Sequence, residues 1–190
     1  MKARHVVRLV VIPAISILAF GCTVRNVDFT KLERPARAAE LDAFDSFVGK
    51  WIWTAEALNA AEGSKNWTGT AEWTWALDKR CLHGVMSSRS GDTQYDAAGI
   101  WSWHPAKKQY IWWMFNNLGY PQEGTATYNK DTGVWRMNYK SVGLDGTDSY
   151  GFYTITQTDT DTLDWKMVEW ADAFHTIKKS EMKGTYKRQK

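Results

Sequence analysis

The sequence predicts an all-β protein, an antiparallel up-and-down β-barrel of about ten strands with a short helix before the first strand. Aromatic residues make up 14% of the chain, with twelve Trp against four Pro, and this composition is typical of strands. Short segments with alternating apolar and polar residues follow one another between turn signals, with no long helical pattern between them. Consecutive hairpins would leave exposed edges unless the sheet closes, so we expect a barrel.

Residues 1–21 resemble a lipoprotein-type signal peptide. Basic residues precede an apolar segment that is too short to span a membrane, and the small Gly21 precedes Cys22. We expect Cys22 to be lipidated and to anchor the protein in the bacterial cell envelope, at the periplasmic face of the outer membrane. The alternative is an ordinary cleaved signal. Residues 22–38 are predicted to be a tether, and residues 39–190 the barrel domain.

The net charge of +3 comes from three basic residues in the signal segment, and the rest of the chain is neutral. A neutral body argues against nucleic acid as a partner. Cys81 is the only cysteine after Cys22, so no disulfide can form within the barrel domain.

The predicted elements begin with an amphipathic helix over residues 39–48, where apolar residues recur at intervals of three and four. A first strand follows at 51–57. The second strand alternates most clearly, with one apolar face that consists of Trp67, Gly69, Ala71, Trp73, Trp75 and Leu77.

The third predicted strand spans residues 81–88. After it, a hairpin near the middle of the chain joins residues 94–104 to residues 110–115 through a polar turn. Residues 110–115 are apolar on both faces, which predicts a strand covered on two sides. The remaining predicted strands are residues 124–128, 135–140, 149–156, 163–170, 174–179 and 182–188.

Several motifs resemble the DUF1579 family of uncharacterised bacterial secreted proteins and lipoproteins. They are Phe-Val-Gly-Lys-Trp at 47–51, Trp-His-Pro-Ala-Lys-Lys-Gln-Tyr at 103–110, Trp-Met-Phe-Asn at 113–116, and Gly119. The resemblance implies a calycin-like, lipocalin-related barrel over about residues 41–188 and brings no established activity. Gly49-x-Trp51 with Arg188 is similar to the lipocalin arrangement in which a basic side chain from the last strand covers a Trp of the first.

The aromatic residues on the inner face are the candidate binding residues. Barrels near this size can hold one small ligand, so the rings either line a cavity or fill a core. We expect a small apolar or aromatic ligand as partner. The candidate ligand-binding residues are Trp51, Trp53, Trp73, Trp75, Trp101, Trp103, Trp112, Trp135, Tyr139 and Trp165.

Catalytic chemistry has little support in the sequence. No metal-ligand spacing and no nucleophile or nucleotide motif occurs, so no metal or cofactor is expected and the catalytic residues are unknown. One alternative is an enzyme or haem-binding barrel that uses His175 or His83 in the same cavity. Another is a packed scaffold that binds an envelope partner on its outer face.

The carboxylates and the remaining thiol are expected to be structural. Glu56, Glu72, Asp96, Asp164 and Glu169 are predicted to lie on the solvated outer face. Cys81 is expected to be buried and inert, with a reactive thiol of low pKa as the alternative.

Overall fold

The computed structural model describes residues 28–31, 33–60, 65–142 and 146–190, so the signal segment and Cys22 lie outside the described residues. The chain forms two units, Met1–Pro35 and Ala36–Lys190. In the first unit a short 3₁₀-helix, η1 (Phe29–Lys31), follows Asp28, whose carboxylate accepts the Thr30 hydroxyl at 2.6 Å.

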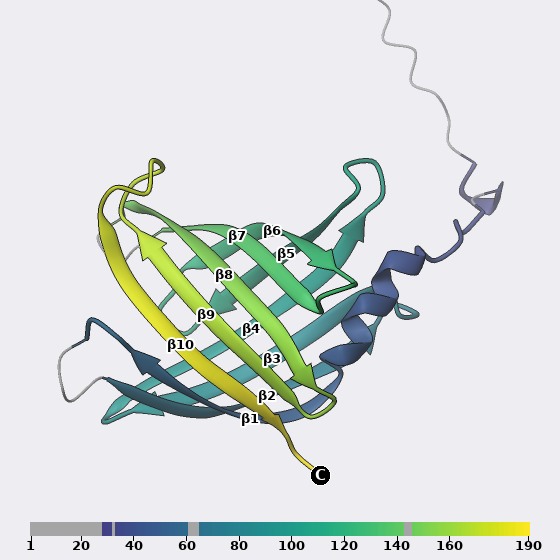
Figure 1. The fold of residues 1–190 in the computed structure, drawn as a ribbon. Coiled ribbons are helices and arrows are strands. Elements are labelled where there is room, and N and C mark those ends of the chain that lie inside the picture. Colours follow the sequence, from purple (N-terminus) through teal and green to yellow (C-terminus); the bar gives the residue numbers. More distant parts are fainter. Residues whose placement is uncertain (1–27, 32, 61–64, 143–145) are drawn as a thin grey trace, which may run out of the picture. The chain divides into compact units, whose positions relative to one another are not determined.

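The second unit is a closed barrel in which each strand pairs antiparallel with the next and β10 pairs with β1 (Figure 1). This confirms the predicted fold class and the short helix before the first strand. The strands are β1 (Gly49–Ala57), β2 (Asn66–Ala76), β3 (Cys81–Ser90), β4 (Thr93–His104), β5 (Gln109–Asn116), β6 (Pro121–Asn129), β7 (Val134–Val142), β8 (Asp148–Asp159), β9 (Thr162–Trp170) and β10 (Lys178–Arg188).

The 3₁₀-helix η2 (Ala39–Ser46) packs its apolar side chains against the barrel interior. The Phe44 ring stacks on Trp135 with centroids 5.2 Å apart, and Phe47 contacts Trp73 at 5.8 Å. A 3₁₀-helix of eight residues is uncommon, because its backbone hydrogen bonds have poor geometry. We therefore attribute the stability of this segment to its packing against the barrel. In Figure 1 η2 lies at the end of the barrel where β1 begins, here called the capped end.

Side chains of the barrel also donate hydrogen bonds to the η2 segment. The Tyr110 hydroxyl donates to the carbonyl of Glu40 at 2.8 Å, and the Trp75 indole N–H donates to the Asp45 carboxylate at 2.9 Å. These bonds pair polar groups that would otherwise be left unsatisfied next to the apolar core.

Arg188 closes the barrel between its last and first strands, as the sequence predicts. It is the register partner of Trp51, and its guanidinium carbon lies 4.2 Å from the centre of the Trp51 ring. It also donates to the carbonyls of Val48 and, at 3.0 Å, of Ser46. Trp51 is fully buried beneath it.

Three local predictions are wrong. Strand β5 is covered only on its inner face, since Trp113 is 43% and Phe115 62% exposed on the outer one. Leu77 leaves the strand pattern and is exposed in the β2–β3 turn, where its φ is +52°. No separate strand spans residues 174–179. The Asp172 carboxylate accepts the backbone N–H groups of Phe174 at 2.9 Å and Ile177 at 2.7 Å, and these bonds hold the segment in a loop.

Candidate ligand-binding cavity

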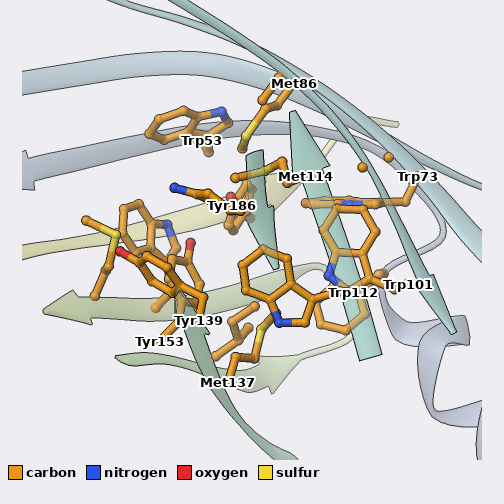
Figure 2. Close-up of a pocket in the computed structure, with 18 of the residues that line it drawn as sticks. Trp53, Trp73, Met86, Trp101, Trp112, Met114, Met137, Tyr139, Tyr153 and Tyr186 are labelled. Carbon is orange, nitrogen blue, oxygen red and sulfur yellow. The ribbon is translucent and has the colours of Figure 1, made fainter. Parts of the chain in front are cut away.

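A cavity of about 310 Å³ lies inside the barrel. Its walls are mainly aromatic and methionine side chains, contributed by the inner faces of the strands and by Phe44 and Phe47 of the η2 segment. In Figure 2, Trp53, Trp73, Trp112, Tyr139 and Tyr186 approach one another from different strands around this space. The volume is at the lower end of the range of small-molecule sites.

Glycines explain why so many large rings leave a cavity rather than fill it. Four rings lie over a glycine that is their cross-strand register partner, in the pairs Trp73–Gly84, Trp112–Gly124, Tyr139–Gly151 and Trp165–Gly184. A Cβ atom placed on any of these glycines would lie 1.9–2.8 Å from the partner ring. Each ring therefore lies over the neighbouring strand, against the wall, and leaves the barrel axis open.

Seven of the ten candidate binding residues line the cavity: Trp53, Trp73, Trp101, Trp112, Trp135, Tyr139 and Trp165. The other three do not. Trp51 lies beneath Arg188, and its indole N–H donates to the Phe47 carbonyl at 2.7 Å. Trp75 is covered by Arg37, 5.1 Å from its ring centre, and Trp103 packs against Tyr110 at 4.8 Å. All three lie at the capped end: Trp51 and Trp75 contact the η2 segment directly, and Trp103 contacts Tyr110, which is bonded to it.

The sequence reasoning missed a further set of lining residues. Five of these residues are methionines, and they give the cavity wall an adaptable, polarisable surface. Four of them, Tyr95, Met114, Met137 and Met167, share the inward phase of a candidate aromatic on the same strand, so the alternation identifies them as inward-facing. The main members of this set are Phe44, Phe47, Met86, Tyr95, Met114, Met137, Tyr153, Met167, Met182 and Tyr186, and Trp67, on the inward face predicted for it, also lines the cavity.

Glu169 does not lie on the solvated outer face that the sequence predicts for it. It lies on β9 in the inward phase of Trp165 and Met167, lines the cavity, and its side chain is 19% exposed. Its Oε2 accepts the Tyr139 hydroxyl at 3.2 Å. Among the described residues that line the cavity, Glu169 alone carries a charged side chain.

The tyrosine hydroxyls of the cavity remain protonated at neutral pH. Burial raises the pKa of Tyr95 to about 12 and that of Tyr186 to about 12. Burial, and then the negative charge of Glu169, raise the pKa of Tyr139 well above its ordinary value. These hydroxyls therefore act as neutral donors and acceptors on an otherwise apolar wall.

Four indole N–H groups of the wall are unpaired. Within the described chain, the Nε1 atoms of Trp53, Trp112, Trp135 and Trp165 are buried and have no hydrogen-bond partner. A buried donor without a partner costs about 1–3 kcal/mol. The nitrogen of Trp112 lies over Gly124.

The histidines of the alternative interpretation do not line the cavity. His83 lies on β3 out of phase with the inward-facing Leu82 and Gly84, and His175 is exposed in the β9–β10 loop, stacked on Trp170 at 4.4 Å. Neither can serve as an acid, base or haem ligand inside the barrel, so these residues do not fit that interpretation. Cys81 is buried, and burial raises the pKa of its thiol, which favours the inert thiol over the reactive alternative.

Two searches of the described residues concern other kinds of site. No group of three or more His, Cys, Asp or Glu side chains in that part of the chain is arranged to hold a metal ion. No helix among these residues has the length and apolar character needed to cross a bilayer.

Comparisons with known proteins show the fold. No family model and no curated protein matches the chain. The crystal structure of Rv2717c from M. tuberculosis matches with a TM-score of 0.59 and 15% identity, over 82% of this chain and 100% of that one. A de novo designed fluorescence-activating β-barrel (TM-score 0.43, 15% identity) covers 78% of this chain and 98% of its own. EF1p2_mFAP2b bound to DFHBI (TM-score 0.43, 13% identity) has the same coverage of 78% and 98%.

Proposed function

We propose that this barrel binds one small, mostly apolar or aromatic molecule in its central cavity. The observation that carries the proposal is the arrangement of the rings, four of which lie over a glycine of the neighbouring strand, around a space of about 310 Å³ inside the barrel. A core that served stability alone gains from filling such a space, because cavities cost about 24 cal/mol per Å³. Retention of the space is what a binding site requires.

The chemistry of the wall supports an apolar or aromatic occupant. Indole and phenol rings offer stacking and edge contacts, and methionines adapt to irregular shapes. The few polar groups that line the cavity, among them Ser88, Gln122 and Glu169, would orient the ligand.

Native mass spectrometry of the protein purified from its natural host tests the proposal. We expect a bound species that adds the mass of one small molecule and is lost on unfolding. A homogeneous, ligand-free mass, together with no saturable binding of small aromatic alcohols, would contradict the proposal and favour a scaffold that acts through its outer face.

We further propose that the barrel is held at a membrane of the cell envelope by a lipid on Cys22. Changing Cys22→Ala removes the lipidation site and is expected to release the protein into the soluble fraction, because a single apolar segment of the signal length gives no stable span. The measurement is fractionation with an alkaline wash. Retention of the variant in washed membranes would exclude lipid anchoring at Cys22.

A further inference from the structure

The charge distribution of the cavity identifies one polar end. Gly151 is the register partner of both Tyr139 on β7 and Glu169 on β9. Without a side chain between them, the Tyr139 ring reaches across β8, and its hydroxyl donates to Glu169 Oε2 at 3.2 Å. Glu169 lies near the end of β9 that is away from η2, so a carboxylate and a phenol hydroxyl together mark the uncapped end of the cavity.

The nearest cation lies outside the cavity. Lys179 Nζ is 3.9 Å from Glu169 Oε1, but its side chain is 40% exposed and does not line the cavity. The Lys179 ammonium therefore offsets part of the charge of Glu169 from outside, and no described cation offsets it from within the cavity. Tyr139 donates to Oε2, and the Lys179 ammonium at 3.9 Å is too far from Oε1 for a hydrogen bond, so Oε1 can accept one from a ligand.

Resting on the proposed function, we infer that the ligand has an apolar or aromatic body and a cationic amine, and that the amine pairs with Glu169 at the uncapped end. A largely buried carboxylate is costly unless it is paired, and an ammonium group pairs it directly. The aromatic walls attract a cation through the negative faces of their rings. A ligand carboxylate would meet the charge of Glu169 with no described cation lining the cavity to offset it.

The indole N–H groups do not reverse this preference. Such groups could donate hydrogen bonds to an anion, but the unpaired nitrogens of Trp53, Trp112, Trp135 and Trp165 are buried rather than exposed to the cavity. The other polar side chains of the wall, such as Ser88 and Gln122, are neutral, so Glu169 carries the one charge among the described lining residues.

Three probes of matched shape separate the ligand classes: 4-phenylbutylamine, 4-phenylbutan-1-ol and 4-phenylbutyrate, each titrated into the barrel by isothermal calorimetry at neutral pH. We expect the amine to bind about tenfold tighter than the alcohol, as a hydrogen bond to a charged group predicts, and the carboxylate to bind weakest.

Three variants locate the preference. Glu169→Gln keeps the shape and an acceptor for Tyr139, and it should bring the amine to within about threefold of the alcohol while the alcohol affinity stays the same. Lys179→Ala removes the competing cation and should increase the preference for the amine. Glu123→Gln, on the exposed outer face of β6, is the matched control and should change neither affinity.

The outcomes separate this inference from the proposed function. If the alcohol binds saturably but the amine is no tighter, or if Glu169→Gln leaves the amine preference intact, the cavity binds ligands and the inferred ligand class is wrong. If none of the three probes binds the wild-type barrel, both the inference and the proposed function are contradicted.

Discussion

The Arg188–Trp51 contact joins the two ends of the barrel sequence. The guanidinium lies over a fully buried indole and donates to the carbonyls of Ser46 and Val48, so it satisfies backbone acceptors where η2 passes into β1. Gly49 permits this approach, because a Cβ there would lie 2.7 Å from the Arg188 guanidinium, and its φ of +126° suits glycine.

Removal of this side chain tests its contribution. Arg188→Ala should lower the free energy of unfolding by about 1–3 kcal/mol through lost packing, lost cation–π attraction and unpaired carbonyls. Arg136→Ala, on the exposed outer face of β7, is the matched control and should change it by no more than about 0.5 kcal/mol. Denaturant melts measure both, and equal small losses would contradict the role given to Arg188.

The same pair shows what single residues in the sequence can predict. The Gly49-x-Trp51 motif together with the distant Arg188 is enough to predict that Arg188 covers Trp51. The inward position of Glu169 was not predicted, because carboxylates are assigned to the surface by default, although its phase with Trp165 pointed inward. Trp75 shared the inward phase of Trp73, yet η2 covers it, and such covering by a separate element cannot be read from alternation.

At the scale of the strand, the pairing of a ring with a glycine decides whether the interior is open. Gly151→Val places a side chain where the Tyr139 ring lies, since even a Cβ would be 1.9 Å from it. We expect a loss of about 1–3 kcal/mol from overpacking and displacement of the ring into the cavity. Thr127→Ile adds bulk on the exposed face of β6 and should be nearly neutral.

The readout is a denaturant melt together with titration of 4-phenylbutan-1-ol. Weaker binding along with the stability loss in Gly151→Val supports the ring–glycine arrangement. Undiminished stability and affinity would show that Tyr139 does not lie over Gly151. The sequence could not predict that a ring lies over a glycine, because this depends on the register between neighbouring strands. The register determines which ring lies opposite each glycine.

For the whole molecule, the alternation of apolar residues and the absence of long helices predicted a closed antiparallel barrel, since an open sheet of this length would expose two edges. Whether that barrel held a cavity or a core stayed open in the sequence. Ring count and barrel size are compatible with both, and the answer lies in how the side chains are directed.

The buried tyrosines make the stability of the whole barrel sensitive to alkaline pH. The pKa is raised to about 12 for Tyr186 and to about 12 for Tyr95, against about 10 in an unfolded chain. Since the folded state retains protons that the unfolded state releases, stability is fully present below pH of about 10 and falls as the pH rises toward about 12. Denaturant midpoints across this range, with tyrosinate absorbance, measure the effect. Ionisation of all eight tyrosines near pH 10 in the folded protein would contradict it.

The central claim is that the space inside the barrel is the binding site, and calorimetric titration of 4-phenylbutan-1-ol into the wild type and a cavity-filled variant tests it most directly. Ala97 is buried on β4 and lines the cavity, so Ala97→Phe fills the space from a rigid strand. We predict saturable binding of one molecule to the wild type and at least about tenfold weaker binding to a folded Ala97→Phe, which is a difference of about 1.4 kcal/mol. Equal affinities of the two proteins would contradict the claim.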